Sequence, residues 1–391
     1  MVHSDSMAPA VLPTTFAADI ADQMRVYNAR YSKESFAATT IADAQGHAFG
    51  KKDGAGVEAV NEIIPAEAAA LRECILQHRE SPSSVTLILD FGCGDGRYLN
   101  ELLHISREHG PLRVVATDIS LGALEAMFLR AKNLGCKPIG SFELAQLWSQ
   151  QSLVWDTLEL VLLLADGTCS VETVEMRCYE VLDGEAHVVV CGWGTLSSIP
   201  PMHGVSRQEA FLAAFCRLGK SLMNVLSNKH VNHLVPQRRF NALRQALADE
   251  NLTAAAREWL LQRLRMAVLP DTYYYPVGVA GSGREWLFYS GIGEEGERNR
   301  LCAAGYSNVQ VRICSIINFY DVLTKPRAAK LNNAIMALLE QGKHWKAQLL
   351  LSRCVARATS RPLHEFRTAP LFNEHWLRNQ VARYFVSIAS R

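Results

Sequence analysis

The sequence predicts an α/β fold in which a mostly parallel, doubly wound sheet is covered by helices on both faces. Short apolar stretches alternate with helical stretches between residues 85 and 227, as in chains built from strand–helix–strand units. The apolar stretches are hydrophobic along their length, which is typical of parallel strands buried on both faces. With 391 residues, 49% of them hydrophobic, the chain suffices for one main domain with sizeable additions.

Residues 1–80 are predicted to form an N-terminal arm and helix that act as a lid. Residues 1–20 are rich in Ala, Ser, Thr and Pro, whereas residues 21–34 have helical spacing and two tyrosines. The pattern at 58–79 predicts a helix with Pro65 near its start, where a missing backbone N–H costs nothing.

Residues 81–228 are predicted to form the core of the sheet. The expected strands are 85–91, 112–117, 158–164, 186–191 and 221–227. The expected helices between them are 97–109, 120–134, 170–180 and 206–217. This regular alternation favours helical crossovers that cover both faces of the sheet.

The alternation stops after residue 228, where residues 229–284 are predicted to form an inserted helical cap on the substrate side. Helical patterns fill most of this segment, and the aromatic stretch 271–276 (Asp-Thr-Tyr-Tyr-Tyr-Pro) is interpreted as a loop. Insertions of this size on a fixed scaffold often carry selectivity for the substrate.

The core sheet is expected to return at 285–324, with a helix near 294–304 and a strand at 308–317. Residues 325–391 are predicted to be a basic helical tail with a final strand at 382–388. The tail holds twelve Lys and Arg against three Glu, a net charge of +9. It is interpreted as the solvated face of covering helices, or alternatively as a patch for RNA or an anionic substrate.

Composition excludes several classes of protein. The net charge of +1 makes no case for a nucleic-acid binder over the whole chain. The ten cysteines are scattered with no pair at the spacing of a zinc or redox site, so no metal is expected and the thiols favour a cytoplasmic location. No signal peptide or membrane span is visible, and no membrane partner is expected.

The most specific motif is a glycine turn between the first strand and the first helix of the core. The strand ends in Asp90, and the turn 92–96 (Gly-Cys-Gly-Asp-Gly) lets backbone approach a ligand closely. Its spacing is G-x-G-x-G and not the G-x-G-x-x-G of dinucleotide folds, which favours a smaller nucleoside over a pyrophosphate. Asp118 ends the next strand, where a carboxylate can bind both ribose hydroxyls.

The segment Asp90 to Gly96 followed by Asp118 resembles the first two motifs of the class I S-adenosylmethionine-dependent methyltransferases. Ala165-Asp166-Gly167 resembles the third motif, and the stretch 190–197 resembles the fourth. The resemblance implies a Rossmann-like methyltransferase sheet with S-adenosylmethionine as cofactor. It also implies that the glycine turn holds the methionine moiety, Asp118 the ribose and Asp166 the adenine.

The expected cofactor-binding residues are those of the four motifs: Asp90, Gly92, Cys93, Gly94, Gly96, Asp118, Ile119, Asp166, Gly167, Gly192 and Trp193. Two of them have other readings, because Asp166 also suits a turn and Trp193 also suits core packing. The chain departs from the family at Ser198, where many relatives have His, and at 136–157, which lengthens the path into the third strand.

Methyl transfer to an activated carbon requires in-line approach of a nucleophile, so positioning can suffice and a general base is optional. The catalytic residue is therefore unknown, with His203, Tyr274 and Tyr31 as candidates. The carboxyl ends of the strands nominate further polar residues by position: Ser197, Ser198, His203, Asn228, Lys229, His230 and His233.

The leading hypothesis is a methyltransferase acting on a small-molecule acceptor, such as a secondary metabolite. One alternative is an RNA (tRNA) methyltransferase that docks through the basic tail. Another is an enzyme that uses the aminocarboxypropyl arm of the cofactor and releases methylthioadenosine, and a third is a subunit that binds the cofactor without turnover. The acceptor, the atom that is methylated and the oligomeric state stay open.

Overall fold

The computed structural model describes most of the predicted core. The described residues are 65–141, 144, 146–192, 195–199, 206–227, 272–279, 283–316, 341–343, 345–347 and 382–391, with isolated residues and pairs elsewhere. Most of the predicted arm, cap and basic tail therefore lies outside the described residues. The boundaries of these segments stay a prediction.

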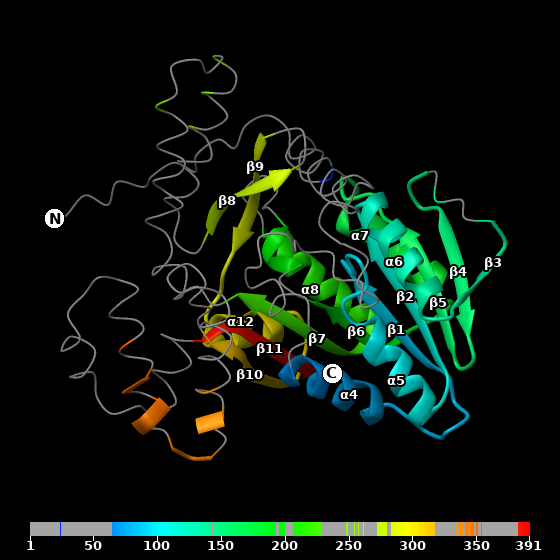
Figure 1. The fold of residues 1–391 in the computed structure, drawn as a ribbon, viewed down its shortest axis with the longest axis horizontal. Coiled ribbons are helices and arrows are strands. Elements are labelled where there is room, and N and C mark those ends of the chain that lie inside the picture. The colour runs from blue at the N-terminus through cyan, green and yellow to red at the C-terminus, as the bar shows by residue number, and fades with distance from the viewer. Residues whose placement is uncertain are drawn as a thin grey trace.

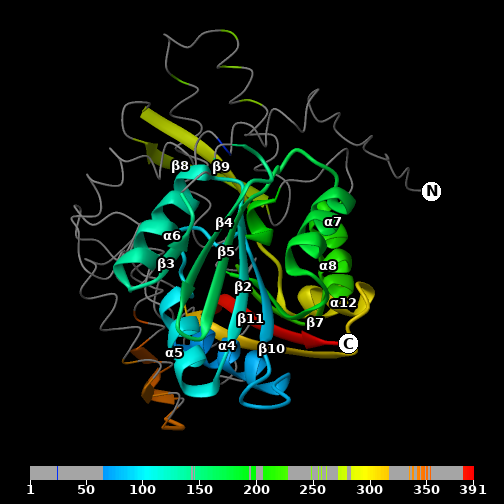
Figure 2. The same ribbon diagram turned by 90° about the vertical axis from the view of Figure 1, so that its right-hand side faces the viewer.

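Five parallel strands form the centre of a nine-stranded sheet (Figures 1 and 2), in the order β5-β2-β1-β6-β7. Their bounds are Thr86–Phe91 for β1, Leu112–Asp118 for β2, Leu158–Leu164 for β5, Ala186–Cys191 for β6 and Gly219–Ser227 for β7. The expected strands of the core are thereby confirmed. The chain winds outward in one direction from β1 to β5 and in the other from β6 to β7, which is the doubly wound topology.

Antiparallel pairs extend the sheet at both edges. Beyond β7, β11 (Ala382–Ser390) runs antiparallel and pairs in turn with β10 (Asn308–Ile316). Beyond β5, β4 (Gln150–Trp155) and β3 (Lys137–Ile139) form a short antiparallel edge. The last strand of the chain is thus enclosed between β7 and β10, and the two predicted late strands are confirmed.

Helices cover both faces of the sheet, as Figure 2 shows. One layer contains α4 (Pro65–Gln77), α5 (Leu99–His109) and α6 (Leu121–Asn133); the other contains α7 (Val171–Leu182), α8 (Arg207–Leu218) and α12 (Glu294–Ala303). Ser120, Ser170 and Ser206 accept a backbone N–H and cap the starts of α6, α7 and α8.

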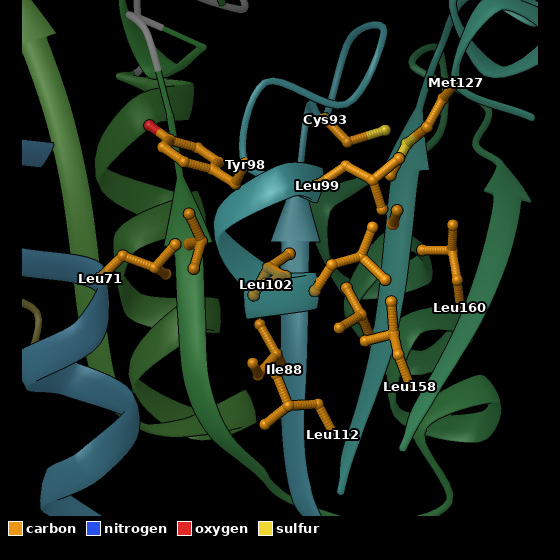
Figure 3. Packing of buried hydrophobic residues seen from close by; sticks show 14 of the residues in the cluster. Leu71, Ile88, Cys93, Tyr98, Leu99, Leu102, Leu112, Met127, Leu158 and Leu160 are labelled. Atoms are coloured by element: carbon orange, nitrogen blue, oxygen red, sulfur yellow. The ribbon is translucent and has the colours of Figure 1, made fainter. Parts of the chain in front are cut away.

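The core consists of two large apolar clusters, one on each face. Strand residues alternate between them, so that Ile88 faces the α5 layer and Leu89 faces the α7 layer. Figure 3 shows part of the first cluster, with Leu102 of α5 over the strands and with Cys93 and Tyr98 at the end nearest the glycine turn. Cys93 and Tyr98 therefore anchor the glycine turn in the core.

Two segments differ from the prediction. The aromatic stretch 271–276 is not a loop, because β8 (Thr272–Val279) pairs with β9 (Gly283–Ser290) in a separate antiparallel ribbon. Pro276 lies within β8, and a ribbon of two strands has only edges, where proline is tolerated. The stretch 136–157 is not merely a longer path, since it folds into β3 and β4.

No helix in the described part of the chain has both the length and the apolar character needed to cross a bilayer. The cytoplasmic location stays a prediction.

Candidate functional site

The strand order places the candidate site between β1 and β6, where the direction of winding reverses. In open sheets of this kind a ligand binds in the crevice at the carboxyl ends of the strands at such a switch point. The neighbours β5, β2, β1 and β6 end there in a row. With about 4.8 Å between adjacent strands the row spans roughly 14 Å, enough for a nucleoside that carries a short chain.

Each of these four strand ends carries one of the predicted motifs. Asp166 follows β5, Asp118 ends β2, the glycine turn follows β1 and Gly192 follows β6. Segments spread over about a hundred residues of sequence thus converge on one edge of the sheet. The structure brings together the described members of the predicted cofactor-binding set.

The glycine turn depends on backbone conformations that other residues adopt at a cost. Gly92, Gly94 and Gly96 have φ values of +71°, +56° and +84°. A Cβ on Gly92 would lie 2.2 Å from Cγ2 of Thr195, and one on Gly96 would lie 2.9 Å from Cγ of Met127. Both conformation and space therefore require glycine at these two positions.

Thr195 joins the turn after β1 to the end of β6. Its Oγ1 lies 2.7 Å from the carbonyl oxygen of Gly192 and 3.2 Å from that of Gly92, so its hydroxyl proton can be donated to either carbonyl. The sequence analysis did not include Thr195 among the site residues. Its place three residues after Gly192 was the available signal, because Thr hydroxyls often bind nearby backbone groups at turns.

Asp118 is held by the backbone of the site. Its Oδ2 accepts the N–H of Gly94 at 2.9 Å, and its Oδ1 accepts the N–H of Ser120 at 2.9 Å. Burial raises the pKa of Asp118 to about 6, although these hydrogen bonds act in the opposite direction. An ionised carboxylate has about four acceptor positions, so Asp118 retains capacity for ribose hydroxyls. Ile119 follows it as a half-buried residue.

Asp90 is a buried carboxyl group beneath the glycine turn. Its side chain is 1% exposed, and neither carboxyl oxygen has a hydrogen-bond partner within the described structure. Burial, and secondarily the charge of Asp118, raise its pKa to about 7. A buried unpartnered carboxyl is costly, and such groups are common where a ligand completes the hydrogen bonding.

Acidic side chains surround the glycine turn. Burial raises the pKa of the Cys93 thiol well above its ordinary value, and the nearby carboxyl groups of Asp118, Asp90 and Asp95 raise it further. Three carboxyl groups at one glycine turn repel a pyrophosphate and attract a cation. The electrostatics thus agree with the glycine spacing in disfavouring a dinucleotide.

The turn after β5 is built differently. Asp166 is partly exposed, and its Oδ1 accepts the N–H of Thr168 at 2.9 Å and the hydroxyl of Thr168 at 2.6 Å. Its other oxygen accepts the Cys169 thiol at 3.4 Å. Partial burial acts to raise the pKa of Asp166, but these hydrogen bonds outweigh it and the pKa is lowered. Asp166 therefore stabilises the turn after β5, which is one of the two roles that the sequence left open for it.

Arginine side chains support two of these turns from outside the predicted set. Arg130 of α6 donates to the carbonyl of Gly96 at 2.8 Å, behind the glycine turn. Arg207 of α8 is 4% exposed and donates to the carbonyl of Gly167 at 3.1 Å. The sequence marked neither residue, because only the fold brings these helices to the turns.

The catalytic candidates His203 and Tyr31 lie outside the described residues, as does the side chain of Tyr274, whose backbone belongs to β8. The predicted cofactor-binding residue Trp193 also lies outside them. The β8–β9 ribbon contacts the short helix η1 (Leu196–Ser198), which follows β6 at the same edge as the site. Within the described ranges, no group of three or more metal-ligating side chains occurs.

No protein-family model matches this chain, and no curated protein matches it. Solved structures that match this chain include methyltransferases, some of them with S-adenosylmethionine or S-adenosylhomocysteine bound. The plantazolicin methyltransferase BamL, with S-adenosylhomocysteine bound, is 9% identical with a TM-score of 0.37, and the match covers 96% of this chain and 97% of that chain. The CcbJ methyltransferase from Streptomyces caelestis is 11% identical with a TM-score of 0.35, covering 83% and 95%.

Phosphoethanolamine N-methyltransferase 2 from Haemonchus contortus, with S-adenosylhomocysteine bound, is 10% identical with a TM-score of 0.33. The match covers 82% of this chain and 52% of that enzyme, so this chain spans about half of its length. At these identities and TM-scores the matches say nothing about the role of this chain.

Proposed function

We propose that the protein is an S-adenosylmethionine-dependent methyltransferase that acts on a small-molecule acceptor. The observation that carries the proposal is the buried, unpartnered carboxyl of Asp90 beneath a glycine turn, with Asp118 at the end of the adjacent strand. A nucleoside with a cationic chain satisfies both groups. S-Adenosylmethionine is such a ligand, since it carries a ribose diol, a sulfonium and an ammonium group.

The residues present fit this cofactor from one end to the other. Asp118 accepts the ribose hydroxyls, the glycine turn admits the chain close to the backbone, and Asp90 receives positive charge. Asp166 and Gly167 stand at the adenine end of the row, as the family resemblance implies. When bound, the cofactor supplies a methyl group on a sulfonium, which needs no metal for its activation.

The work left to the protein is to orient the acceptor and to exclude water from it. Alignment of two reactants alone lowers a barrier substantially, so a general base is optional in this mechanism. The β8–β9 ribbon lies beside η1 at the edge of the site. The contact is made by β9, and its partner β8 belongs to the predicted cap, so we assign the acceptor side to this ribbon.

The test is to incubate the purified protein with S-adenosylmethionine and a metabolite extract or total RNA, and to identify the adenosine products by mass spectrometry. Adenosylhomocysteine formed only with the extract supports the proposal. Its formation only with RNA would overturn the small-molecule assignment and favour docking through the basic tail. Methylthioadenosine would overturn methyl transfer and indicate reaction of the aminocarboxypropyl arm, and binding without any product would indicate a non-catalytic subunit.

The cytoplasmic location also belongs to this proposal. The described cysteines are all free thiols, most of them buried, as the reducing cytoplasm favours. The oligomeric state and the acceptor atom are left to experiment.

A further inference from the structure

The helix before the sheet reaches the glycine turn through one buried carboxylate. Glu67, in the first turn of α4, has a side chain that is fully buried. Arg97, the residue after Gly96, forms an ion pair with Glu67. Its Nε donates to Oε1 of Glu67 at 3.2 Å, and a second guanidinium nitrogen donates to Oε2. The hydroxyl of Tyr98 donates to the same Oε1 at 3.0 Å.

Tyr98 forms a wall of the site at the switch point. The side chain is 2% exposed, and a Cβ built on Gly192 would lie 2.4 Å from its hydroxyl oxygen. The ring therefore fills the space above the end of β6, with Asp90 close enough to influence its pKa. Figure 3 shows it at the end of the core cluster nearest the turn.

This wall stands at the opposite end of the row of strand ends from the ribose and adenine groups. Asp166 and Asp118 follow β5 and β2, whereas Tyr98 packs at β6. A ligand whose ribose lies at Asp118 must extend its chain across the glycine turn toward Tyr98. The residues that Glu67 holds would thus lie nearer to the amino-acid arm of the proposed cofactor than to its ribose.

The chemistry of the cluster fixes the direction of its hydrogen bonds. Burial, and then the charge of Glu67, raise the pKa of Tyr98 well above its ordinary value, so the hydroxyl keeps its proton and remains the donor. The pKa of Arg97 is raised, because its pairing with Glu67 outweighs burial. Arg97 and Tyr98 therefore both keep their protons and act as the donors to Glu67.

We propose that Glu67 is a positioning residue for the amino-acid arm of the cofactor, acting through Arg97 and Tyr98 on the end of the glycine turn and on the wall at Gly192. This inference rests on the proposed function. It assigns α4 a role in ligand binding, beyond covering the sheet.

The same two helices provide a matched control. Arg72 of α4 binds Glu101 at 3.0 Å and Glu108 at 2.7 Å, both on α5, and these contacts are partly exposed. It joins α4 to α5 without touching the glycine turn. Its removal therefore reports on docking of the helix alone.

The experiment compares Glu67→Gln, Tyr98→Phe and Arg72→Gln with the unmodified protein by isothermal titration. The two probes are S-adenosylhomocysteine and methylthioadenosine, which lacks the amino-acid arm. We expect Glu67→Gln to weaken binding of S-adenosylhomocysteine by about tenfold, the scale of one lost hydrogen bond to a charged group, and binding of methylthioadenosine by less than about twofold. Tyr98→Phe should act in the same direction and more weakly, and Arg72→Gln should change neither affinity.

Equal losses for both probes, or no loss for either, would overturn the positioning role. If Glu67→Gln does not fold, Tyr98→Phe decides by the same criterion, because it removes one oxygen and keeps the ring over Gly192. If the unmodified protein binds neither of the two probes, the proposed function itself is refuted. The two failures are therefore distinguishable.

Discussion

The ends of β1 and β5 lie at the same edge of the sheet, yet the acidic residues Asp90 and Asp166 beside them are in opposite states. Asp90 is buried with no partner among the described residues, and its pKa is raised to about 7. Asp166 is partly exposed, accepts three hydrogen bonds from Thr168 and Cys169, and has a lowered pKa. The described part of the chain thus provides hydrogen bonds to the carboxyl group of Asp166 but none to that of Asp90.

This difference shows where ligand binding has the most to gain. A buried polar group without a partner gains a full hydrogen bond when a ligand arrives, whereas a satisfied group gains little. The side of the site at β1 and β2 should therefore dominate the affinity for the cofactor. The side at β5 should contribute less, and four substitutions test this order.

The largest effect is expected for Gly92→Ala. The substituted residue must adopt a φ of +71° and place its Cβ 2.2 Å from Thr195, which together should cost about 3 kcal/mol of stability and abolish measurable cofactor binding. Urea unfolding and titration with S-adenosylhomocysteine measure the two effects. Gly140→Ala is the control, because Gly140 has a φ of +80° with nothing within 4 Å and should lose only about 1 kcal/mol.

Asp118→Ala is expected to have the next largest effect, a loss of about 100-fold in cofactor affinity. The substitution removes the acceptor for the ribose hydroxyls and leaves the N–H of Gly94 without its carboxylate. Titration of the same ligand measures it. Asp183→Asn at the end of α7, which lies at the opposite edge of the sheet, should change the affinity by less than about twofold. Retained binding by Asp118→Ala would refute the ribose assignment.

Asp90 should make cofactor binding depend on pH. Only the ionised carboxyl attracts a cation, so affinity should rise by about tenfold from pH 5.5 to pH 7, where the folded-state pKa of about 7 lies. Asp90→Asn should abolish this dependence. Asp118, whose pKa is about 6, titrates in the same range, so a slope that persists in Asp90→Asn would assign the effect to Asp118.

The protein without ligand should show the opposite trend in stability. Because the folded-state pKa of Asp90 exceeds its ordinary value of 3.8, the folded state binds more protons between these values. The contribution of Asp90 to stability is therefore fully present below about pH 4 and is lost as the pH rises through 7. Urea unfolding across this range, compared with Asp90→Asn, measures the difference.

The comparison also shows how much could be predicted from the sequence. The glycine turn, Asp118 and the alternation of strands and helices are local patterns. The structure confirms the alternation and has Asp118 at the end of β2, whereas the binding roles of these residues stay a prediction. Thr195, Arg130 and the cluster around Glu67 act only through contacts between distant segments, which local patterns do not contain. The β3–β4 edge escaped prediction because β3 is exposed and β4 is half polar, leaving little hydrophobic periodicity.

The smallest effect is expected for Asp166→Ala, about threefold in cofactor affinity. The loss of its hydrogen bonds to Thr168 should cost about 1 kcal/mol of stability, because the turn before α7 loses its acceptor. Thr168→Val removes only the hydroxyl donor and should lower stability without changing affinity. An analogue of the ligand that lacks the adenine amino group should bind Asp166→Ala and the unmodified protein equally well if the carboxylate contacts that group. A loss of cofactor affinity near 100-fold for Asp166→Ala would mean that Asp166 gives up its hydrogen bonds to Thr168 and Cys169 when the ligand binds. The side of the site at β5 would then contribute as much to affinity as the side at β1 and β2, and the expected order would be wrong.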